Sequence, residues 1–311
     1  MTCYYPLSGF IVKDFLGEKG KNHLIIKPYK TTRASFAGKD ISDTWFPVPC
    51  GHCLGCKMEQ AQAWTVRLQL EASLYPDELN HFITLTYDEA HNPVSLIKKD
   101  VQKFMKRLRH TFGECRFFLC GEYGSTTARP HYHLLLFGCN IPDLRPHLLT
   151  DPDGLYISKT LDKIWKFGNC IVGKVTQQSI GYTARYTVKK LASDREHKEM
   201  LNRIGLTPEF ILMSRKPGIG AAAFKKEWFE WNYIPLNGRK YPINRFYIDM
   251  FKKMGYSYDP IKDYMSRTID IDFKKYGDIE NYYNELKNRD IVNNERLKIL
   301  KKRNLDQYGI D

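Results

Sequence analysis

Two histidines separated by a single residue, His131 and His133, precede an apolar run that ends at Phe137. Residues two apart on a β-strand point to the same face, so this spacing presents both imidazoles to one metal ion. Two neutral imidazoles and one carboxylate leave open positions on a divalent ion for a substrate oxygen. Glu122 precedes the histidines across a short polar turn, and we expect it to supply the carboxylate. Because His-x-His is common, the alternative is a pair of ordinary strand histidines.

Two tyrosines four residues apart, Tyr182 and Tyr186, form a second group with chemical potential. On a helix this spacing places both phenols on one face, about 6 Å apart along the axis. A tyrosine hydroxyl attacks phosphorus when it is held in line and when a metal ion and a lysine stabilise the phosphate charge. Lys189, three residues after Tyr186, lies on nearly the same side. Taken alone, aromatic residues at helical spacing more often pack against a core.

Three cysteines recur at intervals of three residues near position 50: Cys50, Cys53 and Cys56. This spacing lets the thiolates reach one ion while the intervening turns stay tight. A structural zinc needs four ligands, so we predict Cys3 as the fourth, or His52 if the N-terminus does not fold back. The alternatives are an iron–sulfur cluster, or a site without metal that includes a redox pair.

Composition favours a polyanionic partner. The chain has 311 residues and 48 Lys and Arg against 35 Asp and Glu, so its formal charge is +13. Basic residues that neutralise phosphates gain affinity by releasing counterions. No apolar run approaches the roughly 20 residues of a membrane span, and the first ten residues do not resemble a signal peptide. We therefore expect neither a membrane protein nor a secreted one, and we expect the remaining cysteines to be buried and reduced.

Hydrophobic periodicity predicts alternating helices and strands in the middle of the chain. The predicted helices cover residues 59–75, 98–112, 161–167 and 178–190. The predicted strands cover residues 81–87, 116–122, 131–137 and 170–175. This order is typical of an α+β domain whose antiparallel sheet is covered by helices on one face.

The order of these segments resembles the three motifs of HUH endonucleases, the superfamily of rolling-circle replication initiators, relaxases and certain transposases. Residues 82–87 come first, Glu122 with the two histidines second, and the paired tyrosines third, as in the two-tyrosine branch. A closer likeness, to the replication initiators of gokushovirus-type microviruses, covers residues 1 to about 245. It is carried by residues 49–56, 82–93, 129–138, 165–190 and 213–220.

This resemblance implies a mechanism. Tyr182 or Tyr186 would nick one strand of duplex phage DNA at its origin and stay joined to the 5′ phosphate, leaving a 3′ hydroxyl for a host polymerase. The other tyrosine would cleave the regenerated origin and release a circular strand. Mg²⁺ or Mn²⁺ on the histidine–glutamate set would polarise the phosphate, and Lys189 would orient or neutralise it. A host helicase is a second implied partner, and the cytoplasm of a bacterial host cell is the implied location.

Nicking chemistry needs an unpaired strand, whose bases stack on aromatic side chains and whose phosphates attract basic ones. The residues that we predict to contact DNA are Arg129, Arg185, Lys190, Arg215 and Lys216.

The resemblance completes the predicted architecture: an HUH endonuclease core, in which helices pack on an antiparallel sheet, with an N-terminal Cys-rich segment and a helical C-terminal tail. The Cys-rich zinc segment and its helix would cover residues 1–78, and the nicking domain 79–195. A basic extension would cover 196–260 and a charged helical tail 261–311.

Two other function classes fit the same residues. The first is a non-catalytic, zinc-stabilised DNA-binding replication protein, in which the histidines and tyrosines only pack or stack. The second is a metal-dependent phosphodiesterase that uses an activated water, in which the tyrosines have no chemical role.

Overall fold

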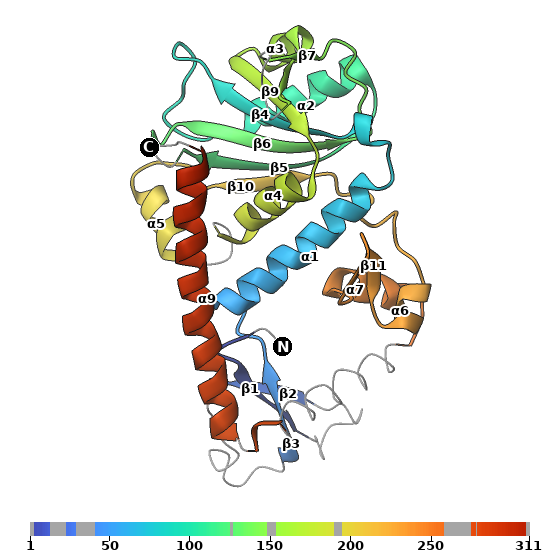
Figure 1. The fold of residues 1–311 in the computed structure, drawn as a ribbon, viewed down its shortest axis with the longest axis vertical. Helices are drawn as coiled ribbons and strands as arrows, with labels where there is room; N and C mark the ends of the chain where they lie inside the picture. The colour runs from blue at the N-terminus through green and yellow to red at the C-terminus, as the bar shows by residue number, and fades with distance from the viewer. Residues whose placement is uncertain are drawn as a thin grey trace. The chain divides into compact units, whose positions relative to one another are not determined.

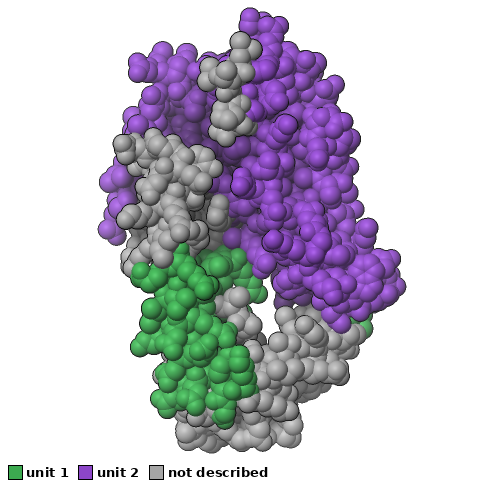
Figure 2. Space-filling model, viewed as in Figure 1, with its two compact units in different colours: residues 1–59, 257–311 green, residues 60–256 purple. Residues whose placement is uncertain are grey.

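The computed structural model describes residues 3–12, 23–28, 41–124, 127–147, 154–189, 195–257, 275–277 and 279–308. The chain forms two compact units. Unit 1 comprises residues 1–59 and 257–311, and unit 2 comprises residues 60–256 (Figure 2). The domain boundaries that we predict at residues 78, 195 and 260 stay predictions.

A seven-stranded antiparallel sheet organises unit 2 (Figure 1). Its strand order is β10-β5-β6-β4-β9-β8-β7. The strands are β4 (His81–Tyr87), β5 (Arg116–Tyr123), β6 (Pro130–Phe137), β7 (Arg145–Pro146), β8 (Tyr156–Ile157), β9 (Gly168–Lys174) and β10 (Phe210–Met213). The predicted α+β class with an antiparallel sheet is confirmed.

Apolar cores lie on both faces of this sheet, so the expectation of one covered face is wrong. Leu134 and Leu136 of β6 belong to one core, and Leu135 and Phe137 belong to the other. Successive side chains of a strand point to opposite faces, so an unbroken apolar run requires cover on both sides. The sequence contains this signal in the run that follows His133.

Helices α2 (Lys98–Phe112) and α3 (Lys159–Trp165) cover the first face. The buried side of α2 consists of Val101, Phe104, Met105 and Leu108, spaced so that one stripe faces the sheet. Gly113 ends α2 with a φ of 86°, a conformation in which a residue without Cβ is favoured.

Helices α1 (Leu54–Ala72) and α4 (Gln177–Lys189) contribute to the second core (Figure 1). Ile180 and Ala184 of α4 pack in this core with Leu68 of α1. Helix α1 begins five residues before its predicted start, because the carbonyl of Cys53 accepts a hydrogen bond from the Lys57 N–H and opens the helix inside the cysteine segment. Helix α1 therefore starts in the segment that carries the cysteine ligands.

The rest of unit 2 surrounds this sheet. The remaining helices are η2 (Asp77–Leu79), α5 (Arg195–Arg203), α6 (Glu227–Trp231) and α7 (Arg245–Lys253). Strands β11 (Ile234–Leu236) and β12 (Arg239–Tyr241) form a separate hairpin.

Unit 1 contains a three-stranded antiparallel sheet of order β2-β1-β3 and a long C-terminal helix. Its elements are β1 (Leu7–Val12), β2 (His23–Lys27), β3 (Ile41–Val48) and α9 (Ile279–Tyr308). The predicted Cys-rich segment and helical tail are both present. Among the described helices, none is long and apolar enough to cross a membrane.

Candidate active site

Strand pairing brings the predicted metal ligands together on the α4 side of the sheet. Glu122 of β5 lies directly opposite His131 of β6. His133 follows two residues later on the same face, opposite Thr84 of β4. The alternation of strand side chains therefore gathers one carboxylate and two imidazoles at one point.

The three side chains converge on a single oxygen. Oε1 of Glu122 lies 2.9 Å from Nε2 of His131 and 2.8 Å from Nε2 of His133. The two imidazole rings have centroids 5.0 Å apart and stand almost perpendicular to each other. One ligand atom from each residue lies within 4.8 Å of the others, which is close enough for one ion. The predicted metal-binding set is therefore assembled in space.

Contacts at the other ring nitrogens orient both histidines. Nδ1 of His131 lies 3.2 Å from the carbonyl oxygen of Arg129, and Nδ1 of His133 lies 3.1 Å from Oγ1 of Thr84. A carbonyl only accepts, so His131 carries its proton on Nδ1 and can present the Nε2 lone pair to a cation. Such second contacts fix ring orientation in metal sites.

Glu122 stays ionised in this environment. Its side chain is buried, and burial by itself would raise the pKa of the carboxyl group. Hydrogen bonds from His131 and His133 outweigh that effect and lower the pKa to about 2. A buried carboxylate with two imidazole partners is the donor set expected of a divalent-cation site that keeps positions open for substrate.

Tyr182 is placed against this cluster by α4. Its hydroxyl lies 3.5 Å from Oε1 of Glu122, and its ring meets the His133 ring edge-on at a centroid distance of 5.3 Å. Tyr186 follows one helical turn later, but only its backbone is described. The same holds for Lys189 and Arg185, and Lys190 lies outside the described residues.

Two residues that sequence analysis did not select support the cluster. Phe82 of β4 stacks on the His133 ring with a centroid distance of 5.5 Å and an interplanar angle of 11°. It also meets Tyr182 edge-on at 6.5 Å. Thr84, two residues later on the same face, bonds to His133. Their spacing on a predicted strand was the available signal, but it does not say which strand lies beside β6.

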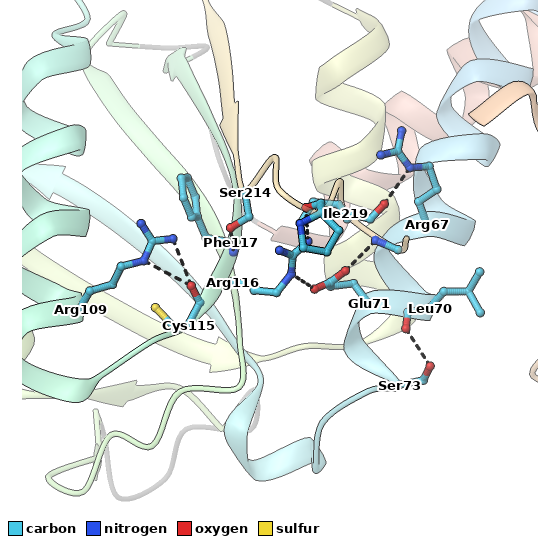
Figure 3. Close-up of polar contacts among 12 residues, drawn as sticks. Arg67, Leu70, Glu71, Ser73, Arg109, Cys115, Arg116, Phe117, Ser214 and Ile219 are labelled. Atoms are coloured by element: carbon cyan, nitrogen blue, oxygen red, sulfur yellow. Dashed lines mark hydrogen bonds and ion pairs between the residues drawn. The ribbon is translucent and has the colours of Figure 1, made fainter. Parts of the chain in front are cut away.

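The basic loop at residues 214–220 is held by a buried polar network (Figure 3). The carboxylate of Glu71, on α1, accepts from Arg116 Nε and, at 2.6 Å, from the Gly220 N–H. Arg116 also donates to the Pro217 carbonyl at 2.8 Å, and Arg67 donates to the Ile219 carbonyl at 3.0 Å.

This network leaves the two predicted DNA-contacting residues of the loop, Arg215 and Lys216, exposed. The third, Arg129, is half-buried and donates to the Tyr87 carbonyl at 3.2 Å. Its own carbonyl positions His131, so at least the backbone of Arg129 belongs to the site.

A second cluster lies in unit 1, where the cysteines Cys3, Cys50, Cys53 and Cys56 meet. The Sγ atoms of Cys50 and Cys56 are 3.9 Å apart, and those of Cys53 and Cys3 are 3.8 Å apart. A tetrahedral zinc with Zn–S bonds of about 2.3 Å needs sulfur atoms about 3.8 Å apart. Cys3 is thus brought into the set as predicted, and His52 is exposed outside it.

Backbone N–H groups point at the sulfur atoms of this cluster. The N–H of Tyr4 donates to Cys53 at 3.4 Å, and that of Cys50 donates to Cys3 at 3.3 Å. Burial raises the pKa of the Cys3 thiol, so thiolate there calls for a cation. The four remaining cysteines are free and buried, as predicted: Cys115, Cys120, Cys139 and Cys170.

Comparison with known proteins places this geometry in a family. A family model that describes replication-associated proteins of the ORF2 type matches residues 80–191, which contain both the histidine–glutamate cluster and α4. No solved structure matches the chain.

Three viral proteins are similar over most of the chain. Replication-associated protein VP4 of Bdellovibrio phage phiMH2K is 32% identical over 223 residues, 67% of this chain and 68% of the relative. Replication-associated protein ORF2 of Spiroplasma virus 4 is 33% identical over 239 residues, 72% of this chain and 70% of the relative. Replication-associated protein ORF4 of Chlamydia phage 1 is 29% identical over 231 residues, 67% and 54% of the two chains. The chain belongs to the replication-associated protein family of gokushovirus-type microviruses.

Proposed function

We propose that this protein starts rolling-circle replication by nicking one strand of the phage origin through a tyrosine. The observation that carries the proposal is the position of the Tyr182 hydroxyl, 3.5 Å from the Glu122 oxygen on which both histidines converge. A scissile phosphate bound at that cluster would meet a phenol and a cation site together. Proximity of this kind is a major part of phosphoryl-transfer catalysis.

The residues of the cluster fit Mg²⁺ or Mn²⁺. His131, His133 and Glu122 would hold the ion through two imidazole nitrogens and one carboxylate oxygen, leaving positions for phosphate oxygens. When bound, the ion supplies Lewis-acid polarisation of the scissile phosphate. Thr84 and the Arg129 carbonyl would keep both imidazoles oriented while substrate enters.

The tyrosine step conserves a phosphodiester bond. The phenolic oxygen of Tyr182 or Tyr186 forms a bond to phosphorus as the bond to the 3′ oxygen breaks, and a proton passes from the phenol to the departing oxygen. The products are a 5′-phosphotyrosine and a free 3′ hydroxyl, which primes a host polymerase. Because one phosphoester replaces another, the reverse reaction needs no external energy, and a second tyrosine can join the displaced strand into a circle.

Basic residues would guide the strand to this centre. Lys189, three residues after Tyr186 on α4, would help neutralise the phosphate. Phosphate contacts are also proposed for Arg129, Arg185, Lys190, Arg215 and Lys216. A host helicase would separate the strands, and the reaction would take place in the cytoplasm of the bacterial host.

We further propose that the four-cysteine cluster holds a structural zinc ion. The sulfur separations and the N–H donors to sulfur support this assignment over a redox pair, in which two cysteines would suffice. With four protein ligands the ion would have no open position, so its contribution would be to the folding of unit 1.

The nicking proposal is tested with Mn²⁺ and labelled single-stranded oligonucleotides that tile the viral genome, followed by denaturing gels. We expect one oligonucleotide to form a covalent protein–DNA adduct. Cleavage without an adduct would indicate a phosphodiesterase that uses water, and intact DNA would indicate a non-catalytic DNA-binding protein. Tyr182→Phe and Tyr186→Phe, tested singly and together, identify the nucleophile, and Tyr233→Phe, just before the β11–β12 hairpin, is a matched control.

A further inference from the structure

A depression of about 350 Å³ lies between α1 and α4 in unit 2. Figure 1 shows these two helices side by side on the face of the sheet that carries the metal-binding cluster. The lining residues come from the first half of α1 and the first turns of α4: Ala61, Gln62, Thr65, Gln177, Gln178 and Gly181.

The depression adjoins the proposed nucleophile along α4. Gly181, which forms part of the lining, is the residue before Tyr182. Gln178 precedes Tyr182 by four residues, so their side chains occupy neighbouring positions on one helix face, about 6 Å apart along the axis. A strand whose phosphate reaches Tyr182 must therefore place a neighbouring nucleotide over this part of α4.

The lining has the chemistry of a base-reading site. The lining residues that the structure describes are uncharged, whereas phosphate contacts are made mainly by Lys and Arg. Three glutamines offer both donors and acceptors, and glutamine amides pair with base edges. Thr65 donates its hydroxyl proton to the Ala61 carbonyl at 2.9 Å, which leaves its oxygen facing as an acceptor.

Gly181 keeps the depression open. Among described residues, no atom lies within 4 Å of the position that a Cβ on Gly181 would take. Glycine inside a helix lowers helix stability relative to alanine, so its presence here is not favoured by helix formation. The volume also falls within the roughly 300–1,000 Å³ of sites that enclose small organic groups.

We propose that this depression binds one nucleobase of the strand that Tyr182 attacks, beside the scissile phosphate, and that Gln62 and Gln178 read its edge. The proposal rests on the proposed nicking function, because it takes the bound strand to be the one cleaved. It makes α4 the carrier of both the nucleophile and a determinant of sequence specificity.

The test uses the full-length protein and a random single-stranded DNA library. With Mn²⁺ present, one arm sequences the strands recovered as covalent adducts, and a second arm sequences the strands retained by binding alone. In the wild type we expect a preference of about tenfold for one base at one position next to the nick, since a paired amide–base contact discriminates by at least this much. Gly181→Leu, Gln62→Leu and Gln178→Leu should flatten that position and leave the others unchanged.

Gly181→Leu is the sharpest variant, because leucine is a better helix former than glycine and fills the space without removing a contact. Gln102→Leu, on exposed α2, is the matched control and should keep the wild-type profile. Unchanged profiles for all three pocket variants in both arms would overturn the proposal. If the wild type forms no adduct, nicking fails, and the binding arm alone decides: a flattened position supports the pocket, and an unchanged profile refutes it.

Discussion

The hydroxyl of Tyr182 lies 3.5 Å from Oε1 of Glu122, a carboxylate 60 residues earlier in the chain. One residue comes from a helix and the other from the sheet beneath it, so the fold joins a nucleophile to a cation site through core packing. Ile180 and Ala184, on either side of Tyr182, are buried in that core and fix the rotation of α4. The phenol therefore faces the cluster because its neighbours in the helix are apolar.

Glu122→Gln should abolish most adduct formation while preserving the shape of the site. The amide keeps the size of the side chain but loses the negative charge that holds a divalent cation beside two neutral imidazoles. We expect the single-turnover rate of adduct formation to fall by about 100-fold or more. The rate is measured on denaturing gels over a range of Mn²⁺ concentrations. Glu114→Gln, at an exposed position, is the control, and equal rates in the two variants would contradict the assignment.

His81 should make unit 2 less stable in mild acid. Burial lowers the pKa of its imidazole below the usual 6.5, more than the bond to the Cys139 carbonyl raises it. The unfolded chain therefore binds this proton more readily, so stability falls as the pH drops below about 6.5. We expect His81→Gln to lose less of its Tm than the wild type between about pH 7.5 and pH 5.5, as followed by circular dichroism. Equal losses would exclude His81 as a source.

The sequence predicted those parts of the site that depend on local periodicity. The spacing of His131 and His133, and the short turn back to Glu122, are properties of one hairpin, and one hairpin suffices to assemble the ligands. The position of Tyr182 on the ligand face could be proposed only from the resemblance, because it depends on how α4 rotates against the sheet.

Contacts between distant segments could not be predicted. The Glu71 carboxylate and the Gly220 N–H are 149 residues apart in sequence, and no local pattern pairs them. Likewise β10 joins the edge of the sheet beside β5 only after the chain has passed through α4 and α5. Such pairings depend on the order of strands in the sheet, which a single sequence does not specify.

Removing the Glu71 carboxylate should destabilise unit 2 strongly. Its side chain is fully buried, and Glu71→Ala leaves both the Arg116 guanidinium and the Gly220 N–H without this acceptor. Breaking a buried pair on one side costs about 3–5 kcal/mol, so we expect a loss of this size in the free energy of unfolding. Urea denaturation measures it. Glu78→Ala, at an exposed site, should change it by less than about 0.5 kcal/mol.

The cysteine cluster should bind one zinc ion per chain. Native mass spectrometry of the purified protein is expected to show that ion, and Cys53→Ser should lose it because three thiolates and a hydroxyl bind zinc weakly. Cys120→Ala, a buried cysteine outside the cluster, should keep it. Iron and visible absorbance in the wild type would instead indicate an iron–sulfur cluster.

Loss of zinc should also loosen the contact between the N-terminus and α9. The N–H of Tyr4 binds the Cys53 sulfur, and its hydroxyl accepts from Asn293 on α9 at 2.7 Å. Hydrogen exchange in residues 286–296 should therefore quicken in Cys53→Ser, and an unchanged rate there would separate α9 from the metal site.

Arg215 and Lys216 should contribute to DNA affinity through charge alone. Both are exposed on a loop whose backbone is fixed by Glu71, Arg116 and Arg67, so truncating either side chain should leave the fold intact. Each phosphate contact adds about 0.7 to the slope of log affinity against log salt for a single strand. We expect Arg215→Ala and Lys216→Ala each to lower the slope by about this amount, as measured by fluorescence anisotropy on single-stranded DNA. Lys163→Ala, exposed on α3 over the opposite face of the sheet, is the matched control, and a slope that falls equally in this variant would show that net charge, rather than the loop, determines binding.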